Sequence, residues 1–331
     1  EMYLTARQDE LSEATMTGHK YRLQAFTEWC EEEGVDNLNE LTGRDLYAYR
    51  VWRREGAGEG RDEVSPIPLR GQLATVRAFL GFAADIDAVP EALREKVPLP
   101  TVSGSGAVSD TTLDPERAKD ILDYLERFQY ASRQHVILLL LWHTGCRIGG
   151  LRALDVEDCE LDGDDPGVQF CHRPEEGTPL KNQESSERWN AISQSVARVL
   201  RDYIKNQRNA IEDEYGRNPL ITTNRGRAST STIRDNLYAI TRPCWRTGDC
   251  PHDRDIEECD ATNYQSASRC PSSRSPHDAR SGRVTAYRRE DVPRQVVSDR
   301  LNASKQILDK HYDRRGEREK AEQRRDYLPD S

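Results

Sequence analysis

The feature that most constrains this chain is an apolar run, from His135 to His143, within an unusually charged sequence. Charged residues make up 32 % of the 331 positions, so an uninterrupted apolar run predicts a helix that is buried. The run leads directly into Thr144, Gly145, Cys146 and Arg147. Gly145 predicts a tight turn after the helix, and Arg147 should therefore stand at the start of the next helix.

A second stretch, from Ser275 to Tyr312, combines a helix start with residue types that can bind and attack a phosphate. Ser275 followed by Pro276 predicts the first turn of a helix. His277 and Arg280 are three residues apart and share one face of that helix, so both can point at one phosphate. Tyr312 follows Arg280 by thirty-two residues.

Taken together, these motifs resemble the tyrosine recombinases, the family of phage integrases and Xer-type resolving enzymes. The resemblance rests on T-G-x-R followed by L-x-x-L, then H-x-x-R, then a tyrosine thirty-two residues later, and it covers residues 113–312. It implies a site-specific DNA recombinase that cleaves and rejoins strands through a 3′-phosphotyrosyl intermediate, without a metal or ATP. It implies double-stranded DNA as the partner and a homotetramer in the synaptic complex, while any accessory proteins stay unknown.

The resemblance also assigns the catalytic residues. Tyr312 would be the nucleophile, because a phosphotyrosyl ester conserves the energy of the phosphodiester bond. Arg147 and Arg280 would hold the non-bridging oxygens, since a guanidinium is planar, permanently charged and able to bind two oxygens at once. Lys181, expected on a β-hairpin between the two arginine motifs, would be the general acid for the leaving 5′ oxygen. His277 would take or relay the phenolic proton, because an imidazole titrates near neutral pH.

The sequence departs from the family pattern at two positions. Gly150 stands where an acidic residue usually follows the first arginine, and Ala303 stands where a histidine or tryptophan would bind the scissile phosphate. His311 and Asn302 are the candidates for an auxiliary donor in its place, and the loss of one donor normally lowers the rate of such a reaction. The departures keep open a weak or inactive recombinase-derived DNA-binding protein; a type IB topoisomerase-like enzyme is a further alternative.

The expected fold class is mainly α with a small antiparallel β-sheet, in two domains. Residues 1–100 should form a helical, SAM-like core-binding domain that clamps DNA, although a generic helical bundle explains the same pattern. Residues 101–112 are small, polar and rich in Gly and Ser, which predicts a linker. Residues 113–331 should form the α+β catalytic domain, with a tail from residue 313 that either packs on a neighbouring subunit or is solvated. Helices are predicted at 16–33, 43–53, 66–84, 90–96, 135–143, 194–209 and 232–242, and strands within 155–170 and 187–192, around turns at Gly163 and Gly177. The resemblance implies a last helix over 301–312.

The net charge of −10 and the pI near 5.4 argue at first sight against a nucleic-acid-binding protein. Net charge averages over all faces, however, and DNA requires only a local basic surface. The acid-rich composition, in which Arg greatly outnumbers Lys, resembles that of proteins from salt-loving archaea. No apolar run approaches the ~18–20 residues that span a bilayer, and no signal peptide is recognisable. We therefore expect a cytoplasmic protein, nucleoid-associated when bound to DNA, with no membrane partner.

Four of the eight cysteines fall within an insertion at about residues 243–272, immediately before the His277 motif. Without a secretory signal, disulfides are not expected there. Thiolates and an imidazole at such short spacing suit a tetrahedral zinc ion, although plain reduced cysteines explain the pattern too. The ligand set expected for structural zinc is Cys244, Cys250, Cys259 and Cys270, with His252 as an alternate ligand. No cofactor is expected for catalysis itself.

Overall fold

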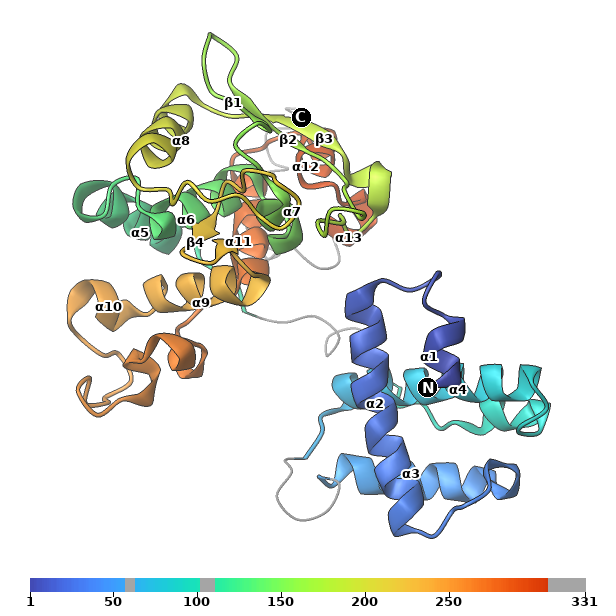
Figure 1. Ribbon diagram of the computed structural model, residues 1–331. Coiled ribbons are helices and arrows are strands. Elements are labelled where there is room, and N and C mark those ends of the chain that lie inside the picture. The colour runs from blue at the N-terminus through green and yellow to red at the C-terminus, as the bar shows by residue number, and fades with distance from the viewer. Residues whose placement is uncertain (57–62, 102–110, 309–331) are drawn as a thin grey trace, which may run out of the picture. The chain divides into compact units, whose positions relative to one another are not determined.

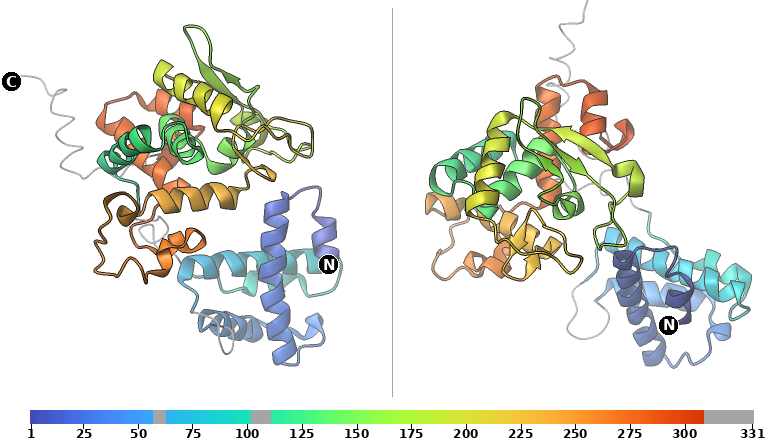
Figure 2. Two further views of the ribbon diagram at one scale, coloured as in Figure 1. Left: turned by 60° about the vertical axis from the view of Figure 1, so that its left-hand side comes forward. Right: turned by 45° about the horizontal axis from the view of Figure 1, so that its top comes forward.

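The computed structural model describes residues 1–56, 63–101 and 111–308. The chain divides into two compact units, Glu1–Ser109 and Asp110–Ser331. Both views of Figure 2 show helices alone in the first unit and the strands in the second. His311, Tyr312 and the tail from residue 313 lie outside the described residues, as do residues 102–110 of the expected linker.

In its described residues, the first unit packs four α-helices and two 3-10 helices around an aromatic core. Its elements are α1 Met2–Ala6, α2 Glu13–Glu32, η1 Leu38–Glu40, α3 Gly43–Arg54, α4 Pro66–Asp85 and η2 Glu91–Lys96. Phe26 and Trp29 of α2 meet Tyr49 of α3, and all three side chains are at most 3 % exposed. The rings of Phe26 and Tyr49 lie edge to face with centroids 5.0 Å apart, the arrangement that aromatic quadrupoles favour.

Local signals explain where the helices of the first unit begin and end. Thr42 and Asp45 form a capping box at the start of α3, so two backbone N–H groups that the helix leaves unpaired find acceptors. Gly34 takes a left-handed φ of 69° just after α2, which allows the chain to reverse. The three long predicted helices are confirmed. The stretch predicted as a fourth helix, 90–96, is the 3-10 helix η2, and α1 was not predicted.

The second unit is a helical domain with two small antiparallel sheets (Figure 1). Its α-helices are α5 Pro115–Phe128, α6 Arg133–Thr144, α7 Ile148–Ala153, α8 Gln194–Asn206, α9 Thr230–Ile240, α10 Pro243–Thr247, α11 Pro276–Arg289, α12 Arg294–Leu301 and α13 Lys305–Ile307. Its strands are β1 Cys159–Glu160, β2 Gly167–Phe170, β3 Arg188–Ala191, β4 Thr222–Thr223 and β5 Gly226–Arg227, and its 3-10 helices are η3 Gln183–Ser186, η4 Asp260–Thr262 and η5 Tyr264–Arg269. The predicted fold class, mainly α with a small antiparallel sheet, is confirmed.

Helix α6 is the centre of this unit, as its apolar sequence predicted. Val136, Ile137, Leu138, Leu140 and Leu141 are fully buried, among residues of α5, α8, α9 and α11. Burying each such side chain contributes roughly 1.5–3 kcal/mol before the entropic cost of ordering it. Although α6 is the most apolar stretch, it has only 12 residues. None of the helices in the described part of the chain is both long and apolar enough to cross a membrane.

The three-stranded sheet is shorter than the sequence suggested. Its strand order is β1-β2-β3, with Val168 opposite Asn190 and Phe170 opposite Arg188. The chain turns at Gly163, which has a φ of 85°, so β1 and β2 are separate short strands within the predicted range 155–170. Asp155, at the start of that range, forms an isolated bridge to Pro219 instead. Its buried carboxylate also accepts hydrogen bonds from Arg217 at 2.5 Å and Arg227 at 2.6 Å, so charge pairing outweighs strand pairing there.

Candidate functional site

The turn between α6 and α7 fixes the first candidate residue, Arg147. Gly145 ends α6 with a left-handed φ of 64°, and its N–H donates to the carbonyl of Leu141 at 3.0 Å. The N–H of Cys146 donates to the hydroxyl of Thr144 at 3.2 Å, which braces the turn from within. Arg147 is consequently the N-cap of α7, as predicted. Its half-buried side chain extends from a turn whose backbone these hydrogen bonds hold in place.

Helix α11 supplies the second candidate arginine. A capping box between Ser275 and Asp278 starts the helix, which confirms the predicted beginning. Arg280 is 1 % exposed, and its Nη1 donates to the carbonyl of Gly145 at 2.5 Å. Arg280 therefore reaches the turn that presents Arg147, although the two arginines lie 133 residues apart in the sequence. His277 lies in the first turn of the same helix and is exposed.

Two further arginines, Arg188 of β3 and Arg300 of α12, join Arg147 and Arg280 in one cluster. The pKa of the Arg188 guanidinium is lowered to about 10, chiefly by burial and also by the charges of Arg280, Arg147 and Arg300, against a rise from Cys146. Between described residues, no ion pair includes Arg147, Arg188 or Arg300. Their hydrogen bonds go to carbonyl, amide and phenol oxygens. Arg147, Arg188 and Arg300 are thus clustered, half-buried cations without an acidic partner among the described residues, which favours the binding of an anion.

Lys181 lies on the long loop that joins β2 to β3. The base of this loop is held by ion pairs and hydrogen bonds: Arg173 pairs with Asp158 at 2.6 Å, and Arg217 donates to the hydroxyl of Thr178 at 2.9 Å. Beyond that base, Lys181 is exposed. Because these contacts anchor the loop, the ammonium group of Lys181 can approach a ligand while the sheet stays in place.

Asn302 links this loop to Arg147. It ends α12 in a left-handed conformation, with a φ of 49°. Its Oδ1 accepts hydrogen bonds from Asn182 at 2.9 Å, Ser186 at 3.0 Å and Arg147 at 3.4 Å, and its Nδ2 donates to the carbonyl of Ser185 at 2.6 Å. Asn182, the residue after Lys181, is thereby bound to Asn302, which also contacts Arg147. Because Leu301 closes α12, the prediction of one helix over 301–312 is wrong at its start.

Comparison with solved structures shows that the chain has a known fold. A Tn1549 transposon integrase in complex with a circular intermediate DNA matches 98 % of this chain and 97 % of its own, with 14 % identity and a TM-score of 0.64. A lambda integrase dimer bound to a COC′ core site matches 92 % of this chain and 94 % of its own, with 13 % identity and a TM-score of 0.59. The chain has the two-domain integrase fold.

Sequence comparison adds less than the fold does. No protein-family model matches the chain, and no curated protein matches its sequence significantly. The N-terminal domain of a phage integrase/site-specific recombinase from Haloarcula marismortui is 38 % identical over 30 % of this chain and 89 % of its own, with a TM-score of 0.28.

The integrase fold of this chain accommodates both departures from the family pattern. A Cβ on Gly150 would lie 3.3 Å from the ring of Phe170, so the ring fills the space next to Gly150. Ala303 is 7 % exposed and belongs to an apolar cluster with Val284 and Val297. Position 303 therefore faces a hydrophobic core, while the polar side chain of Asn302 meets Arg147. Of the two auxiliary donors that the sequence suggested, the described residues include Asn302 and not His311.

In the cysteine insertion, the four thiols are neighbours but are not gathered as metal ligands. Burial raises the pKa of the Cys244 thiol, and the charges of Cys270, Cys250 and Cys259 raise it further, against a lowering by Arg242. All eight cysteines are free. His252 bonds to the hydroxyl of Ser272 at 3.0 Å. Within the described ranges, no three His, Cys, Asp or Glu side chains are arranged to hold a metal ion, so structural zinc stays a prediction.

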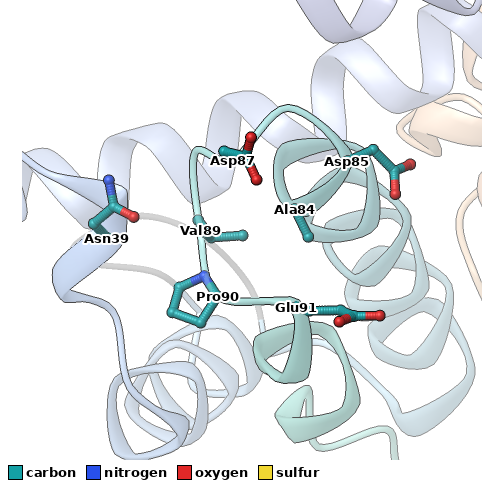
Figure 3. Close-up of a pocket in the computed structure, with 7 residues that line it drawn as sticks. All are labelled: Asn39, Ala84, Asp85, Asp87, Val89, Pro90 and Glu91. Carbon is teal, nitrogen blue, oxygen red and sulfur yellow. The ribbon is translucent and has the colours of Figure 1, made fainter.

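The first unit contains a hollow of about 420 Å³ at the end of α4 (Figure 3). Its lining residues are Asn39, Ala84, Asp85, Asp87, Val89, Pro90 and Glu91. Three carboxylates in so small a space repel a phosphate, whereas the arginine cluster attracts one. The arginine cluster, with Lys181 and His277 on neighbouring segments, is therefore the candidate site.

Proposed function

We propose that this protein is a site-specific DNA recombinase that cleaves and rejoins strands through a 3′-phosphotyrosyl bond to Tyr312. The observation that carries the proposal is the hydrogen bond from buried Arg280 to the carbonyl of Gly145, in the turn that presents Arg147. It joins the two arginine motifs at one point of an integrase fold. Each guanidinium can bind two phosphate oxygens at once, so a phosphodiester suits the pair.

Arg147 and Arg280 would bind the non-bridging oxygens of the scissile phosphate. Negative charge grows on these oxygens as the phosphorus becomes five-coordinate, so fixed cations stabilise the transition state more than the ground state. Both guanidinium groups are held by backbone carbonyls, Gly145 for Arg280 and Asn302 for Arg147. Their orientation is therefore set before the DNA arrives, and little reorganisation is needed during the reaction.

Two proton transfers accompany the cleavage step. The phenol oxygen of Tyr312 forms a bond to phosphorus while the bond to the 5′ oxygen breaks, and His277 accepts the phenolic proton. Lys181 gives a proton to the departing 5′ oxygen, so a neutral hydroxyl leaves. In the second step the 5′ hydroxyl of a partner strand attacks the phosphorus and the bond to Tyr312 breaks. Lys181 takes back a proton from that hydroxyl, and His277 returns a proton to the departing phenolate.

The partner is double-stranded DNA, with a homotetramer holding two duplexes in the cytoplasm at the nucleoid. The neighbouring integrase structures, which contain DNA, support the first part of this proposal. The acidic composition supports a protein adapted to high salt, in which counterion release contributes little to DNA affinity. Specific contacts at the arginine cluster would then carry more of the binding.

The test begins with selection of bound duplexes from a randomised library, in high and low salt. The selected sequence is then made as a nicked duplex, on which a covalent adduct is trapped when the short cleaved strand diffuses away. Wild-type protein should form a denaturation-resistant adduct, and Tyr312→Phe should form none. Specific binding without an adduct would support the non-catalytic DNA-binding protein instead. Relaxation of supercoils without strand exchange between two sites would support a topoisomerase.

A further inference from the structure

We propose that Arg188 is a positioning residue for the leaving-group step: it holds the loop that carries Lys181 against the end of α12. The inference deepens the proposed recombinase function and rests on it. None of the motifs in the sequence includes Arg188. The sequence predicts only that it lies in a strand, 187–192, and its contacts come from the structure. Figure 1 shows β3 beside α12.

Arg188 binds three separate segments with one guanidinium. Its Nε donates to the carbonyl of Arg300 at 2.8 Å, in the last turn of α12. Its Nη1 donates to the carbonyl of Ser186 at 2.9 Å, at the end of the loop. Its guanidinium carbon lies 4.1 Å from the centroid of the Phe170 ring on β2. A planar cation with several donors can join a sheet, a loop and a helix end at once, which a lysine cannot.

The stacking on Phe170 depends on Gly150. A Cβ at position 150 would lie 3.3 Å from the Phe170 ring, so any longer side chain would displace the ring from beneath Arg188. The family usually has an acidic residue at this position. Here the space is taken by an aromatic ring with a cation above it, which links the Gly150 departure to the presence of Arg188.

Arg188 binds the carbonyls of Ser186 and Arg300, which lie on either side of the contact between the loop and Asn302. Ser186 donates its hydroxyl to Asn302 Oδ1, and Asn182, next to Lys181, does the same through its amide. Arg300 is two residues before Asn302. Loss of Arg188 would therefore loosen the loop with Lys181, relative to the helix end that meets the phosphate site. The guanidinium of Arg280 and the backbone of Arg147 would stay in place, because the α6–α7 turn holds both.

Because loss of Arg188 would loosen the loop with Lys181 and not the α6–α7 turn, we expect a selective defect in protonation of the 5′ oxygen. A duplex with sulfur in place of the bridging 5′ oxygen separates protonation from phosphate binding, because a thiolate is a good leaving group without a proton. Arg188→Gln should slow cleavage of the ordinary duplex by about 100-fold, the lower range for general acid catalysis. On the sulfur-substituted duplex it should cleave within a few-fold of wild type, as should Lys181→Ala.

The experiment uses the full chain and the duplex selected above, nicked, with oxygen or sulfur at the 5′ bridging position. Arg147→Ala should stay slow on both duplexes, and Arg198→Gln, an exposed arginine of α8, should resemble wild type on both. Thermal unfolding checks that the variants fold, and Arg188→Lys provides a second variant that keeps the charge but not the two-pronged geometry. It should show the same selective defect in milder form.

Equal slowing of Arg188→Gln on both duplexes, or no slowing on the ordinary one, would overturn the role of Arg188. If Arg188→Gln fails to fold, the same outcomes of Arg188→Lys decide. Wild-type protein that cleaves neither duplex would contradict the recombinase function itself, a result distinct from a failure of this inference.

Discussion

The Cγ of Leu301 lies 2.9 Å from the point where a Cβ on Gly145 would stand. The last residue of α12 thus packs directly on the turn that ends α6, and the turn has space for it only because residue 145 has no side chain. Gly145 also accepts the hydrogen bond from Arg280. One glycine therefore sets the positions of Arg147, Arg280 and the helix end that carries Asn302.

Gly145→Ala should destabilise the second unit and abolish cleavage. The left-handed φ of 64° disfavours alanine, and the new methyl group would overlap Leu301, for a combined cost of about 2–4 kcal/mol. Urea unfolding measures the loss. Gly149→Ala is the matched control, because a Cβ there meets nothing within 4 Å and α7 should gain slightly from alanine. Equal stability of the two variants would contradict the packing argument.

Asn302→Gly should leave the fold intact and slow cleavage by about 10-fold or more, because the guanidinium of Arg147 and the loop with Lys181 would lose the side chain that orients both. Glycine adopts the left-handed conformation of residue 302 at no cost, so the change removes only the amide that joins Arg147, Asn182 and Ser186. Adduct formation on the nicked duplex gives the rate, and thermal unfolding gives the stability. Wild-type cleavage by this variant would show that the Asn302 amide has no part in the reaction.

The sequence predicted those parts of the site that depend on local signals. The α6 helix follows from its apolar run, the turn from Gly145 and the start of α11 from Ser275 and Pro276. Each of these signals lies within a few residues of the structure that it determines. The paired strands were located correctly but were predicted too long, because the charge pairing of Asp155 with Arg217 and Arg227 involves residues more than 60 positions away.

The contacts of Arg188 and Asn302 could not be read from the sequence. Arg188 binds the carbonyl of Arg300, 112 residues later, and Asn302 meets Arg147, 155 residues earlier. Arginine and asparagine are common on surfaces, so neither residue type marks a buried network. The mismatch at Ala303 directed attention to Asn302 as one of two candidate donors. The structure shows its amide bound to Arg147, Asn182 and Ser186, and its role as a phosphate donor stays a prediction.

The stability of the second unit should fall between pH 6.5 and pH 4 because of His135. This side chain is 3 % exposed, its Nδ1 accepts a hydrogen bond from the N–H of Ala131 at 3.2 Å, and burial lowers its pKa to about 4. The unfolded chain, with an ordinary histidine pKa near 6.5, takes up a proton first as the pH falls. The stabilisation that comes from keeping His135 neutral is complete above pH 6.5 and is lost as the pH drops to 4. The free energy of unfolding should fall by up to about 3 kcal/mol over this range.

His135→Asn isolates this effect, because the amide oxygen can replace Nδ1 as the acceptor while nothing at position 135 titrates. Urea unfolding at pH 7.5 and pH 4.5 should show a smaller loss for the variant than for wild type. Other groups, including His143 with its similarly lowered pKa, titrate alike in both proteins and cancel in the difference. Identical pH profiles would rule out His135 as the cause.

Metal analysis of protein purified without chelators tests the zinc prediction for the cysteine insertion. Between α9 and α11 the chain forms only α10 and two short 3-10 helices, and a structural metal would stabilise so loop-rich a segment. Zinc binding requires the thiols of Cys244, Cys250, Cys259 and Cys270 to turn toward one point. About one zinc per chain is expected, and Cys244→Ser or Cys259→Ser should lose it and lower the unfolding temperature.

Cys171→Ser, at a half-buried cysteine outside the insertion, is the control and should retain the metal. A zinc content near zero in the wild-type protein would leave four plain thiols. The insertion would then depend on its packing against α9, which places Ala267 among the most buried residues, and on the hydrogen bond from the Ser273 hydroxyl to the Ala267 carbonyl at 2.6 Å. Because that packing needs no metal, the cleavage site at Arg147 and Arg280 should act in either case, and chelators should leave the rate of adduct formation unchanged.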